Sequence, residues 1–147
     1  RDVAISGNYA IVGANQESPN GTSGGGAAYI FQRNTDGSWN VVQKIVANDK
    51  AEYDSFGFSV AIDGSYAIVG AIYADPKSKA GAGAAYIFER NTNGTWSERK
   101  KIVASDREAY DNFGFSVAIS GNYAIVGAYQ EDPDGIAGAG SAYIFEG

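Results

Sequence analysis

The chain contains no cysteine, histidine or methionine among its 147 residues. Without thiolate or imidazole side chains, it lacks the ligands of the usual zinc sites and every catalytic triad that needs Cys or His. Carboxylates, hydroxyls, Lys, Arg and Tyr are what remain for chemistry. We therefore expect a non-enzymatic protein with no catalytic residues. A glycosidase is the leading enzymatic alternative, and it would need two carboxyl groups held together in one cleft.

Positive charge and long apolar runs are also scarce. The chain has 11 Lys and Arg against 17 Asp and Glu, which gives a net charge of −6. Because binding to a phosphate backbone needs a basic surface, we expect no nucleic-acid partner. No stretch approaches the roughly 18 apolar residues of a membrane span, so none is expected. The sequence opens without Met or a signal peptide, which we interpret as a processed or excised piece of a protein.

A repeat of 57 residues dominates what the sequence does contain. It is marked by Val3, Val60 and Val117, and no insertion disturbs the spacing. Such regularity indicates that each unit is one supersecondary module. We expect the whole chain, 1–147, to be part of one domain with units at about 1–55 (first strand truncated), 56–112 and 113–147 (last strand missing).

A full unit carries four short runs of strand-forming residues between turn signals. In the middle unit the runs are Phe58–Ile62, Tyr66–Ala71, Ala84–Glu89 and Trp96–Ala104. The first three are apolar on both faces, as in a sheet covered on both sides, and the fourth is partly charged, as in an exposed outer strand. This pattern predicts all-β architecture with four-stranded antiparallel β-propeller blades. A β-sandwich would not require the strict repeat.

The number of units predicts an incomplete propeller segment. Propellers close with roughly 4–8 blades, whereas this chain supplies about two and a half. We therefore expect its partners to be further blades of the same protein or other copies of itself. Head-to-tail packing of copies would produce rings or filaments.

Three recurring motifs resemble the FG-GAP repeats of integrin-α-like propellers and of secreted or surface bacterial proteins. They are Phe-Gly at 56–57 and 113–114, Ile-Val-Gly-Ala at 11–14, 68–71 and 125–128, and Ala-Tyr-Ile-Phe at 28–31, 85–88 and 142–145. The resemblance implies an extracellular or cell-surface location and a role in adhesion or protein binding. The proline of the GAP element is absent, since Asn15, Ile72 and Tyr129 take its place.

The resemblance also raises the question of calcium. Calcium-binding relatives carry a loop rich in Asp between the first two strands of a unit, but here that connection is only Ser6-Gly7-Asn8 or its equivalents. Three residues with at most one carboxylate cannot surround Ca²⁺, so we expect no cofactor there. Asp132 and Asp134 are the best remaining candidates for weak Ca²⁺ binding.

Acidic residues gather on the long connections, which a meander of four strands places on one end of the sheets. The candidate binding residues on this end are Glu17, Asp49, Asp54, Asp75, Asp106, Asp111, Glu131, Asp132 and Asp134. Two interpretations stay open: a surface for a ligand or partner, or solvated charge that keeps the protein in solution. Asp54 and Asp111 precede Phe-Gly and are expected mainly to cap a turn.

The two tryptophans and two N-x-Thr triplets are the remaining candidate features of the sequence. Trp39 and Trp96 open the fourth strand, where we expect them to cover the outer blade edge; the alternative is a sugar-binding shelf, as in lectin propellers. Asn20 and Asn93 lie in N-x-Thr triplets compatible with glycosylation. The leading hypothesis is an adhesion module that binds a protein or glycan ligand. A self-assembling structural subunit and a carbohydrate-binding propeller are the alternatives.

Overall fold

The computed structural model describes residues 1–75, 80–130, 136 and 139–147, and within them the chain forms three antiparallel sheets. The first sheet contains β1 (Val3–Ser6), β2 (Tyr9–Ala14), β3 (Ala27–Arg33) and β4 (Trp39–Ile45), with the 3-10 turn η1 (Pro19–Gly21) between β2 and β3. The second contains β5 (Phe56–Asp63), β6 (Tyr66–Ala71), β7 (Ala84–Arg90) and β8 (Trp96–Ile102). The third contains β9 (Phe113–Ser120), β10 (Tyr123–Ala128) and β11 (Ser141–Glu146). Strands adjacent in sequence are adjacent in each sheet, as the sequence predicted.

Short hairpins join the first two strands of each sheet. Ser6 pairs with Tyr9, so the connection has only two residues, and Gly7 adopts a left-handed φ of 56° there. Glycine takes such a φ without the steric cost that a Cβ would bring. Gly64 and Gly121 repeat this conformation, which explains the recurrence of the turn every 57 residues.

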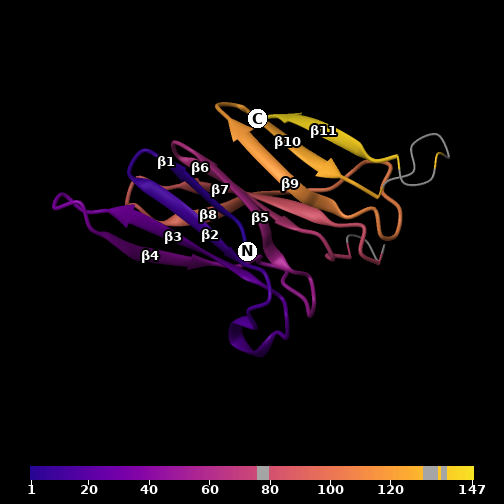
Figure 1. The fold of residues 1–147 in the computed structure, drawn as a ribbon, viewed down its shortest axis with the longest axis horizontal. Coiled ribbons are helices and arrows are strands. Elements are labelled where there is room, and N and C mark those ends of the chain that lie inside the picture. The colour runs from indigo at the N-terminus through magenta and orange to yellow at the C-terminus, as the bar shows by residue number, and fades with distance from the viewer. Residues whose placement is uncertain (76–79, 131–135, 137–138) are drawn as a thin grey trace.

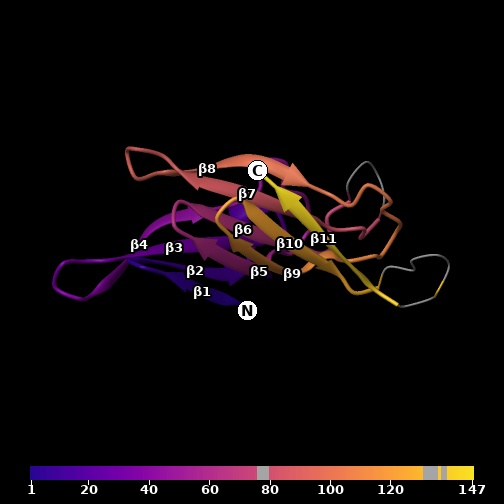
Figure 2. The ribbon, with the colours of Figure 1, turned by 90° about the horizontal axis from the view of Figure 1, so that it is seen from above.

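The sheets pack face to face, with the second between the first and the third (Figures 1 and 2). One face of the middle sheet carries Val60, Val69 and Tyr86, and it packs on the first sheet. Its opposite face carries Ile68 and Ile87, and it packs on the third. We call these the Val–Tyr face and the Ile face. Because both are covered, the middle strands are apolar on both sides, as expected.

The stack leaves one apolar face open at each end of the described chain. The Val–Tyr face of the first sheet exposes Val3 at 69%. The Ile face of the third sheet exposes Ile144 at 73%. The equivalent residues of the middle sheet, Val60 and Ile87, are covered by neighbouring sheets. The segment is therefore a set of stacked blades that does not close into a ring, as the sequence predicted.

Glycines allow the inner strands of neighbouring sheets to approach very closely. A Cβ on Gly13 would lie 2.0 Å from the carbonyl oxygen of Gly57, and a Cβ on Gly26 would lie 2.0 Å from that of Phe56. Gly26 also forms a parallel bridge with Phe56. Only residues without a side chain fit such backbone contacts, so the repeated glycines are part of the blade interface.

Trp96 opens β8, the outer strand of the second sheet, and its side chain is buried against the first blade. Its exposure is 3%, and its ring packs edge-on against Tyr9 of the first sheet with centroids 5.9 Å apart. The side chain of Gln43 donates to the Trp96 carbonyl and accepts from the Trp96 backbone N–H, each at 2.8 Å. Trp39, one repeat earlier, is 39% exposed.

Candidate functional site

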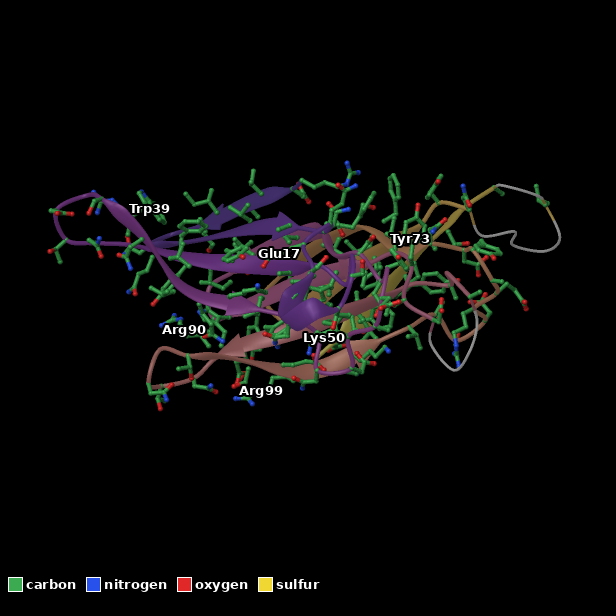
Figure 3. All side chains as sticks on the ribbon, turned by 90° about the horizontal axis from the view of Figure 1, so that it is seen from below. Glu17, Trp39, Lys50, Tyr73, Arg90 and Arg99 are labelled. Carbon is green, nitrogen blue, oxygen red and sulfur yellow. The ribbon has the colours of Figure 1, made fainter. Side chains whose placement is uncertain are left out.

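The long connections lie together at one end of the sheets, which we call the loop end. The described connections that form it span 15–26, 46–55, 72–75, 80–83 and 103–112. Figure 3 shows Lys50 and Tyr73 toward this end, whereas Trp39 and Arg90 lie toward the opposite, hairpin end. The acidic connections that the structure describes therefore lie at one end of the sheets.

Backbone hydrogen bonds tie each connection to the next one along the stack. Tyr53 N–H donates to the Ser23 carbonyl and Tyr110 N–H donates to the Ala80 carbonyl, both at 2.8 Å. Tyr73 N–H donates to the Asp54 carbonyl at 3.2 Å. Since these bonds cross between connections of different strands, the loop end is held as one continuous surface.

Asp49 joins the first and second blades. It follows β4, yet its Oδ1 accepts a 2.8 Å hydrogen bond from the Tyr86 hydroxyl on β7, and its Oδ2 pairs with Lys101 on β8. Burial opposes ionisation of Asp49, but the bonds from Lys101 and Tyr86 outweigh it and lower the pKa of the carboxyl group. Burial and the Asp49 bond raise the pKa of Tyr86. Asp49 is therefore a charged link between blades.

An equivalent link joins the second and third blades, whereas the first sheet has a similar contact within its own unit. Asp106, which follows β8, accepts a 2.7 Å bond from the Tyr143 hydroxyl on β11. In the first sheet Glu17 takes the corresponding role, bonding Tyr29 and Lys44 from within its own sheet. The bonds from Lys44 and Tyr29 lower the pKa of Glu17.

Asp54 and Asp111 are buried and hold the turn that precedes each Phe-Gly. The Asp54 carboxylate accepts from the Ala51 N–H at 2.9 Å, and the Asp111 carboxylate accepts from the Glu108 N–H at 2.6 Å. Burial raises the pKa of Asp54 to about 6, despite the bond from Ala51. These contacts are of the capping type expected from the sequence.

Asp75 binds backbone in a similar way, since its Oδ1 accepts from the Gly81 N–H at 2.6 Å. Of the six described candidate acids, Asp54, Asp75 and Asp111 bond backbone within the loop end, and Glu17, Asp49 and Asp106 bond side chains on adjoining strands. Glu131, Asp132 and Asp134 lie outside the described residues, so the structure says nothing of the weak calcium candidates. The described part of the chain contains no group of three or more acidic residues arranged to hold a metal ion.

Two exposed tyrosines at the loop end were missed by the sequence analysis. Tyr53 and Tyr110 are 65% and 64% exposed, with left-handed φ angles of 64° and 65°. Their rings lie over Gly24 and Gly81, where a Cβ would come within 3.1 and 3.0 Å of the ring atoms. The signal in the sequence was Tyr-Asp at the same place in two successive units, three residues before Phe-Gly. An exposed aromatic residue held in a strained conformation marks a candidate functional position.

Further exposed tyrosines extend this aromatic surface. Tyr73, two residues after β6, and Tyr129, directly after β10, are 50% and 48% exposed. The loop end therefore combines acidic side chains fixed by internal contacts with aromatic rings open to solvent. Tyrosine presents a large, stiff ring and a hydroxyl together, which suits it to recognition surfaces.

Comparison with known families accounts for the repeat. A model of the FG-GAP repeat matches residues 1–31, 39–88 and 96–145. The chain belongs to the FG-GAP repeat family. No curated protein matches it at a significant level. The FG-GAP match supports a β-propeller-type module, a class that is generally non-enzymatic and typically occurs in extracellular proteins.

The structure gives a physical reason for the FG-GAP motif in this chain. Gly57 of the Phe-Gly pair faces Gly13 of the preceding Ile-Val-Gly-Ala element and the carbonyl of Ala27, which follows Gly26. The neighbouring Phe56 is fully buried, with its ring 5.4 Å from that of Tyr86. FG-GAP glycines therefore form backbone contacts between blades, and the phenylalanine fills the core beside them.

The second and third FG-GAP matches begin with β4 and β8 and end within β7 and β11. Each matched unit therefore includes the connection that passes from one blade to the next. That connection carries Asp49 or Asp106 and the exposed Tyr53 or Tyr110. Among the described residues, no helix is long and apolar enough to cross a membrane.

Proposed function

We propose that this FG-GAP segment is a non-enzymatic binding or adhesion module of an extracellular or cell-surface protein, and that it contacts its ligand through the loop end. The observation that carries the proposal is the pair Tyr53 and Tyr110, exposed at equivalent positions of two successive connections. Function often resides on loops that a rigid scaffold holds in place.

The contacts within the loop end favour a surface formed before the ligand arrives. Asp54 and Asp75 hold backbone amides, and Asp49 is held by Tyr86 and Lys101. Ordering these groups in advance reduces the entropy lost on binding. A negative surface with open tyrosine rings suits a partner that offers positive charge or sugar rings, which covers both protein and glycan ligands.

The test is a binding screen of the intact chain against extracellular-matrix proteins and a glycan array. Any ligand found is then measured with Tyr53→Ala and Tyr110→Ala, and Trp39→Ala serves as an exposed aromatic control at the hairpin end. We expect each tyrosine substitution to weaken binding about tenfold or more, and the control to have no effect. A ligand whose affinity ignores both tyrosines would refute the loop-end proposal. Loss with Trp39→Ala alone would favour a sugar-binding shelf.

Self-assembly is the second candidate. The open Val–Tyr face of the first sheet and the open Ile face of the third are equivalent to the surfaces that pack together inside the stack. Val3 and Ile5 correspond to Val60 and Ile62, whose face packs on the preceding sheet. At the hairpin end, Asp63 Oδ2 accepts from the Gly121 N–H at 2.7 Å, and Ser6 Oγ accepts from the Gly64 N–H at 3.2 Å. Ser120 and Gly7 are the counterparts at the two open faces.

Copies that reuse this interface would associate head to tail into rings or filaments. Light scattering and electron microscopy of the purified chain between 1 and 100 µM would detect them. We expect the mass to rise with concentration, and a monomer throughout this range would exclude the assembly function. Ligand binding by a monomer would still support the loop-end proposal, so the two candidates are separable.

A further inference from the structure

Tyr53 and Tyr110 are supported in the same way on two successive connections. Each ring lies against the backbone of a glycine, Gly24 for Tyr53 and Gly81 for Tyr110. Each backbone N–H is fixed at 2.8 Å by a carbonyl group of the neighbouring connection. One side of each ring is therefore supported by the protein, while most of the side chain is exposed. The two residues form equivalent aromatic platforms that exist before a ligand binds.

Tyr73 lies between these platforms along the stack. Its N–H donates to the carbonyl of Asp54, the residue after Tyr53, at 3.2 Å. The same β6–β7 connection accepts the Tyr110 N–H through the Ala80 carbonyl. The three connections are thus bonded to one another in the order Tyr53, Tyr73, Tyr110. Tyr73 is half exposed at the loop end (Figure 3), so these three residues present a row of rings, which we call the tyrosine row.

Much of the negative charge near the tyrosine row is engaged by the protein itself. Asp49 pairs with Lys101, and Glu17 pairs with Lys44. Asp54 is buried and bonds a backbone amide. Within the described connections, these contacts leave less negative charge for a cationic partner than the sequence alone indicates.

Groups of both charge signs lie close in sequence to each platform. Lys50 and Glu52 precede Tyr53, and the next unit carries Arg107 and Glu108 in the corresponding connection. Ammonium and guanidinium groups donate hydrogen bonds, whereas carboxylates accept them. Because a hydroxyl group both donates and accepts, such pairs suit an uncharged ligand that is rich in hydroxyl groups.

We propose that the tyrosine row binds a linear, uncharged polysaccharide with flat pyranose rings, of the kind found in β-1,4-linked glucans. This inference rests on the proposed function of the loop end and names the chemical class of its ligand. The C–H groups on the flat side of such a sugar pack on the electron-rich face of an aromatic ring. A polymer of identical rings matches a row of equivalent platforms, and its hydroxyl groups bond the charged residues beside them.

Two other polymers also bind rows of aromatic rings, and the structure favours neither. Single-stranded nucleic acid stacks its bases on such rings, but it also needs a basic groove for its phosphates, and this chain has a net charge of −6. Proline-rich peptides dock into grooves lined by aromatic side chains. Tyr53 and Tyr110 instead rest on glycine backbone and open to solvent, as flat platforms for a flat ring.

The spacing of the blades predicts that affinity depends on the length of the sugar chain. Stacked sheets lie about 10 Å apart, so a short sugar reaches one platform and a longer chain reaches two. Contact with the second platform is then intramolecular and raises the affinity without any new kind of contact. We expect a β-1,4-linked glucose hexasaccharide to bind at least about tenfold more tightly than the disaccharide.

The test is calorimetric titration of the intact chain with β-1,4-linked glucose oligosaccharides, from the disaccharide to the hexasaccharide. Tyr53→Ala and Tyr110→Ala should each weaken hexasaccharide binding about tenfold, to the level of the disaccharide. Tyr53→Phe should keep the parent affinity, because stacking uses the ring. Tyr123→Ala removes an exposed tyrosine at the hairpin end and should have no effect. Raising the salt concentration should change the affinity little, since the ligand is uncharged.

Three results would overturn the inference: no oligosaccharide binding, equal affinity for the hexasaccharide and the disaccharide, or an affinity that both alanine substitutions leave unchanged. If the ligand screen instead finds a basic protein or a proline-rich peptide that needs the same tyrosines, the loop-end proposal stands and the polysaccharide inference fails. If no ligand in either experiment depends on Tyr53 or Tyr110, both fail.

Discussion

Gly70 of the second blade faces Gly114 of the third so closely that a Cβ on Gly70 would lie 2.1 Å from the Gly114 carbonyl oxygen. Gly13 and Gly57 repeat this relationship between the first and second blades. Glycine recurs at these positions for a steric reason. A side chain on either residue would push apart the backbones of two neighbouring blades.

Gly70→Ala is expected to lower the free energy of unfolding by ~3 kcal/mol or more, because backbone atoms cannot move aside as a flexible side chain can. Gly127→Ala is the matched control. A Cβ there would meet Ser116 Oγ at 2.6 Å, much as one on Gly70 would meet Ser59 Oγ at 2.4 Å, but no backbone oxygen of a following blade is near. We expect the control to cost less than ~1 kcal/mol. Urea denaturation of both variants, monitored by tryptophan fluorescence, measures the difference.

If Gly70→Ala and Gly127→Ala lower the free energy of unfolding by similar amounts, the contact with serine, and not the contact with backbone, would be the cause.

Gly127→Ala has a further use if copies assemble head to tail. The residue belongs to the open end of the stack, so alanine there should block association while leaving the monomer folded. That result would link the internal interface to the assembly interface.

Asp49 and Tyr86 should be energetically coupled, since their 2.8 Å hydrogen bond joins two blades and Tyr86 is buried. We expect Asp49→Ala to cost ~1.5–3 kcal/mol, the usual range for a hydrogen bond to a charged group. A double-mutant cycle with Tyr86→Phe should return a coupling energy of ~1 kcal/mol or more. Glu52→Ala, at an exposed position of the same connection, is the control. Additive losses from Asp49 and Tyr86 would rule out the proposed link.

Much of this fold could be predicted because period and strand pattern are properties of local sequence. The blade partners of individual side chains could not be predicted in the same way. The charged strand that begins at Trp96 indicated an outer edge, but Tyr9 and Gln43 of the preceding blade bury its first residue. The capping contact of Asp54 was predicted from its place before Phe-Gly, but nothing local to Asp49 indicated that Tyr86 of the next blade would bond it.

The exposed tyrosines show a second limit. Left-handed backbone is signalled in sequence by Gly or Asn, and tyrosine carries no such signal. Tyr53 and Tyr110 could have been singled out only by their recurrence beside Asp54 and Asp111. Their conformation depends on backbone bonds to Ser23 and to its equivalent in the next unit, which come from another connection.

Asp54 should make the stability of the chain depend on pH between about 4 and 6. Its folded pKa of about 6 exceeds the ordinary value of 3.8, so in this window the folded state binds more protons than the unfolded state. Its contribution therefore favours folding below pH 4 and is lost as pH rises through 6. Asp54→Asn retains an oxygen for the Ala51 N–H but has no charge to bury. We expect this variant to be more stable than the parent at pH 7.5, by up to about 3 kcal/mol, and nearly equal to it at pH 4.

Denaturation of the Asp54→Asn variant and the parent at several pH values isolates this effect, because Glu17 and Asp49, whose lowered pKa values act in the opposite direction, are present in both. A stability difference that does not change with pH would contradict a raised pKa. A variant less stable than the parent at pH 7.5 would show that the charged hydrogen bond to Ala51 outweighs the cost of burial.

Tyr53 should reveal a conflict between stability and binding. Alanine at this position keeps a side chain at φ 64°, whereas glycine relieves the steric cost, so we expect Tyr53→Gly to be ~1 kcal/mol more stable than Tyr53→Ala. Tyr73 provides the opposite control: its φ is not left-handed, and there alanine should be the more stable of the two. Both Tyr53 variants should lose the ligand found in the screen. If Tyr53→Gly kept full affinity, the loop would bind through its backbone shape, and the ring at position 53 would serve only to cover Gly24.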